Sequence, residues 1–210
     1  MDYTLARNAD IDILFNTKLQ IYLEYKSPQY EELAFDIIKC RLIKLGYPSK
    51  IAEYTYDPSF PLRSVDFERS IVYFICSRGL WFDRLYGTLL KMDQFGNILS
   101  CLRGFYLIQR EELRAMYPNK FVKFDEKRIE IMNTLFSLPE TYMLSCVINH
   151  FVSDADYIKT EHGLKKGTLY MSYASIYEDV KAACDWMHTV ISVLYFHVII
   201  TDGHSDRQSD

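Results

Sequence analysis

The stretch PETYMLSCVINHF, residues 139–151, is the most strongly helical part of the sequence. Tyr142, Met143, Cys146 and Val147 recur at the spacing that places apolar side chains on one side of a helix. Pro139 suits the first turn of a helix, where its missing N–H group costs nothing, and the following glutamate complements the positive end of the helix. We therefore predict a helix from residue 139 to about residue 152 that packs in the core of the protein.

Two further helices are predicted on either side of this stretch. Residues 28–45 are amphipathic and end before Gly46, and Ser27 is a plausible N-cap with Pro28 at the first helical position. Residues 174–189 carry a second helical pattern, for which Ser172 or Ser175 can supply the N-cap. We expect both helices to pack against the first one.

The remaining local patterns are shorter. Residues 85–93 and 97–106 flank Gln94-Phe95-Gly96, which indicates a β-hairpin over residues 85–106. A helical turn is expected near residues 49–54, a short helix over 111–117, and a polar loop over 154–167. Residues 7–23 could pair as short strands. We expect residues 7–23, 64–77 and 190–210 to be the least ordered parts, with a frayed polar end after residue 200.

The composition describes an ordinary globular protein. Of the 210 residues, 49% are hydrophobic and 25% are charged, and the formal net charge is −4 with both signs mixed along the chain. Since no stripe or block of Lys and Arg is present, we do not expect nucleic acid as a partner. The longest apolar runs fall short of the ~20 residues that span a bilayer, so no membrane association is expected.

The cysteines favour a reducing compartment. Their number is odd and their spacing is wide, and no C-x-x-C pattern occurs. This arrangement is typical of buried free thiols and not of a disulfide framework or a zinc site. No apolar signal segment occurs at the start. We therefore expect a cytoplasmic protein.

Many blocks, in a fixed order, resemble the cytosolic purine 5′-nucleotidase family. They are Tyr25-Lys26-Ser27-Pro28-Gln29-Tyr30-Glu31, Leu45-Gly46-Tyr47-Pro48, Phe82-Asp83-Arg84-Leu85-Tyr86-Gly87, Leu89-Leu90-Lys91-Met92-Asp93, Tyr117-Pro118-Asn119-Lys120-Phe121, Asn133-Thr134-Leu135-Phe136-Ser137-Leu138-Pro139-Glu140-Thr141-Tyr142, Met171-Ser172-Tyr173 and Asp185-Trp186-Met187-His188. The resemblance covers most of residues 24–62 and 78–189. It implies Mg²⁺-dependent hydrolysis of purine nucleoside 5′-monophosphates, preferably IMP and GMP, by a homotetramer.

The first five residues, MDYTL, resemble the second half of the Asp-x-Asp-x-Thr motif of the haloacid dehalogenase superfamily. In that motif the first Asp attacks phosphorus and forms an aspartyl-phosphate, and the second serves as general acid and then base. The resemblance gives Asp2 the role of the second carboxylate, makes its backbone carbonyl a Mg²⁺ ligand, and makes Thr4 the threonine that fixes the loop. The expected nucleophile would lie two residues before Asp2.

The resemblance is interrupted at several places. Residues 7–23 and 64–77 have no counterpart that we recognise, nor does the tail 190–210, and the lysine and acidic residues of the later family motifs are not found. We therefore expect a fragment: residues 1–23 as a remnant of the core plus an insert, 24–189 as mainly a cap region with a substrate-facing helix, and an unmatched tail. Such a chain is expected to be inactive. The alternatives are lineage-specific loops, and a non-catalytic cap-like module that binds nucleotide or associates with full-length subunits.

Lys181, Asp185 and His188 match family positions that contact the nucleotide. Their spacing of i, i+4 and i+7 places them on one face of the predicted helix, as the wall of a nucleotide pocket requires. Lys181 stands where the family commonly has arginine, and Thr189 replaces a family tyrosine. The alternative is a solvated Lys–Asp pair beside a surface histidine.

Ile131, Asn133 and Phe136 match positions of a regulatory site for a purine nucleotide such as ATP, where Phe136 would stack on the effector base. A basic residue expected about ten positions earlier is ambiguous, because the alignment near Lys123 carries a deletion. The alternative is that Ile131 and Phe136 are core residues. As a whole, we predict an α/β fold, or α+β for this chain alone: part of a haloacid dehalogenase-like core plus a helical cap with a β-hairpin.

Overall fold

A computed structural model of the protein describes residues 13–16, 20–23, 28–60, 79–132 and 134–205. In these ranges helices are combined with three sheets, and every strand pair is antiparallel. The mixed α/β or α+β class predicted from the sequence is therefore confirmed. The described strands are antiparallel hairpins and meanders, without the parallel order of a doubly wound sheet.

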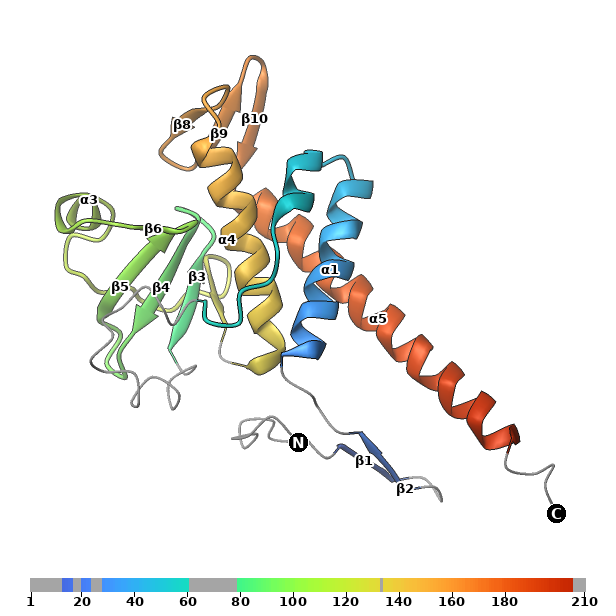
Figure 1. Cartoon of the computed structure of the whole chain (residues 1–210). Helices are drawn as coiled ribbons and strands as arrows, with labels where there is room; N and C mark the ends of the chain where they lie inside the picture. Colours follow the sequence, from blue (N-terminus) through green and yellow to red (C-terminus); the bar gives the residue numbers. More distant parts are fainter. Residues whose placement is uncertain (1–12, 17–19, 24–27, 61–78, 133, 206–210) are drawn as a thin grey trace.

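Three helices form one layer of the molecule. They are α1 (Gln29–Lys44), α4 (Leu138–Ser153) and α5 (Tyr173–Ser205), and each packs on the other two. Helix α4 lies between the largest sheet and the other two helices (Figure 1). This position explains why most of its side chains, from Pro139 to Ile148, are buried on all sides.

The largest sheet has five strands in the order β6–β5–β4–β3–β7. Their bounds are Leu80–Asp83 (β3), Thr88–Met92 (β4), Ile98–Arg103 (β5), Tyr106–Leu107 (β6) and Ile129–Ile131 (β7). One face of the sheet packs against the helices through Phe82, Leu89 and Leu102. The other face, with Leu90 and Cys101, lies under α3 (Arg110–Met116) and the segment that follows it. Both faces are therefore covered.

Two smaller sheets and two short 3₁₀ helices complete the described structure. Strands β8 (Ile158–Thr160), β9 (Gly163–Lys166) and β10 (Leu169–Ser172) form a three-stranded sheet, and β1 (Ile13–Asn16) pairs with β2 (Gln20–Leu23). The 3₁₀ helices are η2 (Ser49–Glu53) and η5 (Leu135–Ser137). The β1–β2 hairpin agrees with the alternation read in residues 7–23.

Three local predictions need correction. Helix α1 begins at Gln29, so that Pro28 is its N-cap residue and not its first helical residue; Ser27 lies outside the described residues. The predicted polar loop over 154–167 contains β8 and β9, which are held by backbone pairing and by the burial of Leu164 in the core. Helix α5 continues beyond residue 189 to Ser205, since neither Pro nor Gly interrupts residues 174–202.

A buried polar network ties the large sheet to its coverings. Asp83, at the end of β3, has no exposed surface. Its carboxylate accepts hydrogen bonds from Nη2 of Arg128 at 2.6 Å and from the hydroxyl of Tyr117 at 2.7 Å. The Tyr117 hydroxyl also lies 2.8 Å from that of Thr88, and the backbone N–H of Leu85 donates to Asp83. One carboxylate therefore holds β3, β4, the end of α3 and the approach to β7 together.

Removing this carboxylate is expected to destabilise the fold strongly. In Asp83→Ala, the Arg128 guanidinium and the Tyr117 hydroxyl lose their partner inside the protein, which costs about 3–5 kcal/mol. Urea unfolding followed by circular dichroism measures the loss. Lys166→Ala removes an exposed ion pair with Asp156 and is the control, which should leave the midpoint almost unchanged. Equal effects of the two changes would contradict the importance of the network.

Gly87 offers a second test, because it combines a left-handed backbone with a lack of space. Its φ is +62°, and a Cβ atom there would lie 2.3 Å from the Tyr173 ring, whereas Gly167 has φ +60° and open space around it. Alanine at Gly167 should cost about 1 kcal/mol through backbone strain. Alanine at Gly87 should cost a further ~1–3 kcal/mol through overpacking. Similar unfolding free energies for both variants would refute the close approach of Tyr173.

Candidate functional site

Helix α5 carries the three residues predicted to face a nucleotide. Lys181, Asp185 and His188 all lie within it, and helical geometry places them along one side. The Lys181 side chain is partly buried, whereas Asp185 and His188 reach the surface. Packing against the protein lowers the pKa of His188, although the nearby Asp185 opposes this shift. The structure therefore brings the three side chains to one face, as the sequence predicts.

The partner of this face is Glu140, in the first turn of α4. Its carboxylate Oε2 lies 3.7 Å from Nζ of Lys181, and the residue is only 6% exposed. Burial raises the pKa of Glu140 to about 7; Lys181 opposes this rise, and Glu130 and Asp185 add to it. The sequence identified Glu140 only as a favourable residue at a helix start. The signal in the sequence was an acidic residue in the first turn of a helix that is otherwise almost entirely apolar, since such an acid is rarely buried without a function.

A second group of charges adjoins the first from the sheet side. Arg84, just after β3, donates Nη2 to Glu130 of β7 at 2.6 Å and Nη1 to Glu178 of α5 at 3.3 Å. The Arg84 guanidinium also lies over the Tyr177 ring, 4.2 Å from its centroid, and that ring stacks on Phe82. Sequence reasoning did not find these contacts, because they join segments that are far apart in the chain.

We call the combined set the charged face. It comprises Arg84, Glu130, Glu140, Glu178, Lys181, Asp185 and His188. Four carboxylates and two permanent cations meet there, so carboxylates outnumber cations among these residues. Such a face can accept hydrogen bonds from N–H and O–H groups of a ligand at several points, and it can donate mainly through Lys181.

Two of the three predicted effector residues lie in the described part of the chain, on different elements. Ile131 is in the edge strand β7, is 40% exposed, and pairs with Trp81 of β3, so that both side chains lie on the same face. Phe136 is in η5, where its ring meets the Tyr30 ring edge-on at 6.0 Å. Asn133 lies outside the described residues. The structure thus gives Phe136 an aromatic partner within the chain.

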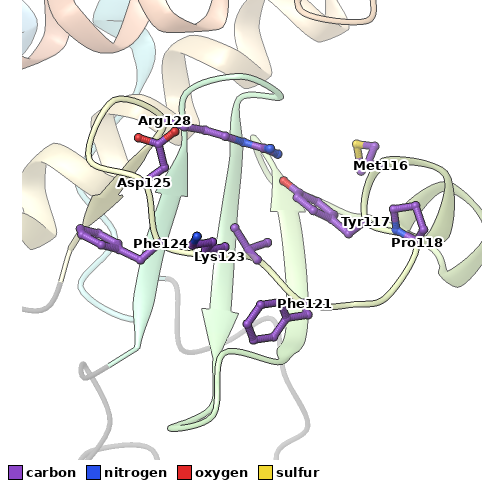
Figure 2. Close-up of a pocket in the computed structure, with 9 residues that line it drawn as sticks. Met116, Tyr117, Pro118, Phe121, Lys123, Phe124, Asp125 and Arg128 are labelled. Carbon is purple, nitrogen blue, oxygen red and sulfur yellow. The ribbon is translucent and has the colours of Figure 1, made fainter.

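A groove of about 550 Å³ opens beside Trp81. It lies between the end of α3 and the approach to β7, and Figure 2 shows its lining side chains over the sheet: Met116, Tyr117, Pro118, Phe121, Val122, Lys123, Phe124, Asp125 and Arg128. The Phe124 ring packs against Trp81 at 5.8 Å, which connects the groove to the side of the sheet that carries Ile131. The ambiguous position near Lys123 therefore lies close to this predicted effector residue.

The catalytic and metal-binding predictions fall elsewhere. Asp2, expected as general acid and as a Mg²⁺ ligand through its carbonyl, lies outside the described residues, as does Thr4. Within the described ranges no group of three or more His, Cys, Asp or Glu side chains is arranged to hold a metal ion. Binding of Mg²⁺ therefore stays a prediction that rests on the resemblance at Asp2. In the same part of the chain, no helix is long and apolar enough to cross a membrane.

Comparison with known proteins defines the class. The sequence profile of the 5′ nucleotidase family matches residues 22–199, and this protein belongs to that family. That range runs through residues 64–77 and into the tail; the domain boundaries drawn from the sequence remain predictions.

Two relatives illustrate the relationship. The chain is 26% identical over 192 residues to a 5′-nucleotidase domain-containing protein of Dictyostelium discoideum. It is also 26% identical over 200 residues to 5′-nucleotidase domain-containing protein 2 of Homo sapiens. Each alignment covers 89% of this chain but 25% and 29% of the respective relative. The chain therefore spans little more than a quarter of the length of these curated relatives.

The buried acid of the charged face predicts a distinctive dependence of stability on pH. The pKa of Glu140 is about 7 in the folded protein and lies near the ordinary glutamate value of 4.5 in the unfolded protein. Because the pKa is higher in the folded protein, Glu140 makes a contribution to the free energy of unfolding that is fully present below about pH 4.5. This contribution is lost as the pH rises through 7. The loss amounts to about 3 kcal/mol.

Glu140→Gln removes the titrating group and should abolish this part of the pH dependence. We expect the variant to be more stable than the parent at pH 8 and to differ much less at pH 5, as measured by urea unfolding at both values. Parallel pH profiles of the two proteins would show that Glu140 does not titrate with a raised pKa.

Proposed function

We propose that the protein binds purine nucleoside 5′-monophosphates on its charged face, as part of a magnesium-dependent 5′-nucleotidase. The observation that carries the proposal is the meeting of Lys181 and Asp185 on α5 with the buried Glu140 of α4, in a chain of the 5′ nucleotidase family. If Lys181 and Asp185 were only a solvated surface pair, no buried carboxylate from a second helix would be needed beside them.

The chemistry of the face suits the base and ribose of a nucleotide. A 6-oxopurine such as hypoxanthine or guanine presents a carbonyl oxygen beside an N–H group. The Lys181 ammonium can donate to such an oxygen, and the Asp185 carboxylate can accept from the neighbouring N–H group. Adenine presents an amino group and an unprotonated ring nitrogen at the same positions. This difference supports a preference for IMP and GMP over AMP.

The reaction itself is proposed from the resemblance. Asp2 would protonate the leaving ribose oxygen and then activate water against an aspartyl-phosphate, and Mg²⁺ would neutralise charge on the phosphoryl oxygens. We propose a cytoplasmic homotetramer as the working form. The alternative is a non-catalytic, cap-like chain that binds nucleotide or associates with full-length subunits; the well-packed helices α1, α4 and α5 are compatible with either function.

We also propose a purine nucleotide effector such as ATP near the groove. The observation that favours it is the cluster of Trp81, Phe124 and Ile131, in which aromatic and apolar side chains lie next to Lys123. A purine ring can pack on such surfaces while an ammonium group faces the phosphates. Asn133 and Phe136 complete the proposed set.

The substrate proposal predicts that binding depends on the charged face. Lys181→Met and Asp185→Asn should each weaken IMP binding by about tenfold to a hundredfold, since each removes a charged hydrogen-bonding group. Isothermal titration calorimetry with IMP measures the affinity. Lys166→Met, on the small β8–β10 sheet, changes an exposed lysine elsewhere and should have no effect. Equal affinities for all four proteins would overturn the proposed location of the site.

A second experiment addresses catalysis. No complete Asp-x-Asp-x-Thr motif occurs in the 210 residues, and removing a nucleophile lowers turnover by several orders of magnitude. We expect no phosphate release from IMP with Mg²⁺ above the buffer rate, measured by a colorimetric phosphate assay. Hydrolysis that disappears in Asp2→Asn would show that the polypeptide is an active enzyme.

A further inference from the structure

We propose that Glu140 is a positioning residue: in its ionised form it draws the Lys181 ammonium away from the nucleotide, so that nucleotide binding depends on the uptake of a proton. This inference rests on the proposed function and adds a regulatory property to the same site. It concerns a residue that is almost entirely buried behind Lys181, with its Oε1 atom shielded from solvent.

The hydrogen bonding of Glu140 is incomplete. Its Oε2 atom lies 3.7 Å from Nζ of Lys181, which is longer than a strong charge-assisted hydrogen bond. Its Oε1 atom has no hydrogen-bond partner within the described part of the chain. An ionised carboxylate in that position is poorly compensated, whereas a protonated carboxyl group tolerates burial far better. The site therefore favours the neutral acid more than an exposed glutamate would.

Other charges around Glu140 act in the same direction. The groups that face it come from α5 and β7: Lys181, Asp185, Cys184, Tyr177 and Glu130. Burial is the main cause that raises the pKa of Glu140 to about 7; Lys181 opposes this rise, and Glu130 and Asp185 add to it because both disfavour a further negative charge. Arg84 is held by Glu130 and Glu178 and does not pair with Glu140 within the described contacts.

The two protonation states present different faces to a ligand. When Glu140 is ionised, it attracts the Lys181 ammonium inward and adds a fourth carboxylate to the face. When Glu140 is neutral, the Lys181 ammonium is released from this attraction and is available to the ligand; Asp185 and Glu130, which also raise the pKa of Lys181, still favour its charged form. The carbonyl oxygen of the proposed base accepts a hydrogen bond from the Lys181 ammonium, so the nucleotide binds the second state more tightly. By linkage, binding then takes up a proton near neutral pH.

Glu140→Gln mimics the neutral acid in size and shape, and it supplies the test. IMP affinity is measured by calorimetry at pH values from about 5.5 to 8.5. We expect the variant and the parent to bind equally at the acidic end, and the variant to bind about tenfold more tightly at the basic end. Ionisation of the phosphate and of His188 affects both proteins alike, so the ratio of affinities isolates Glu140.

A double-mutant cycle with Lys181→Met distinguishes positioning from a general charge effect. If Glu140 acts through Lys181, the effect of Glu140→Gln at the basic end shrinks in the Lys181→Met background. An undiminished effect overturns the positioning role, and superimposable pH profiles of parent and Glu140→Gln overturn the inference while leaving the proposed function intact. If the parent binds no IMP at any pH, the proposed function itself is wrong. Circular dichroism confirms that each variant is folded.

Discussion

The buried ion pair between Asp83 and Arg128 is the constraint from which the candidate site is built. Asp83 ends β3 without any exposed surface, and Arg128 and Tyr117 satisfy its carboxylate. The next residue after Asp83 is Arg84, and two residues after Arg128 comes Glu130, so the pair also fixes where the Arg84–Glu130 bridge forms. The network that stabilises the sheet therefore also fixes the positions of Arg84 and Glu130, the two members of the charged face that the sheet contributes.

Helix α4 provides the opposite side of the charged face and shows how a core helix can carry a polar function at one end. Its middle is buried between the sheet and two helices, which fixes the helix rigidly. Glu140 lies in the first turn, where the helix dipole partly offsets the cost of a buried negative charge. The rigid core thus holds an acid near α5 at a place where solvent could not stabilise it. The raised pKa of Glu140 follows from this geometry.

The sequence predicted those parts that depend on local patterns. Helices α1 and α4 and the β4–β5 hairpin follow from apolar spacing, Pro, and Gly96 at a turn. The small β8–β10 sheet was missed because its strands are short and largely exposed, so that no regular apolar alternation marks them, although Leu164 reaches the core. Lys181, Asp185 and His188 could be placed on one helix face. Glu140 could not be recognised as their partner, because a contact across 41 residues has no local signature.

The excess of carboxylates over cations in the charged face indicates which end of the proposed nucleotide ligand it suits. A phosphate dianion would be repelled by Glu130, Glu140 and Asp185, whereas the N–H groups of a base and the hydroxyls of a ribose can donate to carboxylates. Lys181 supplies a donor for one carbonyl oxygen but no planar fork for a bidentate phosphate contact. The base recognition proposed for this face and the phosphate chemistry proposed for Asp2 would therefore use different side chains. Protonation of Glu140 would change the affinity for the base without altering the phosphate chemistry.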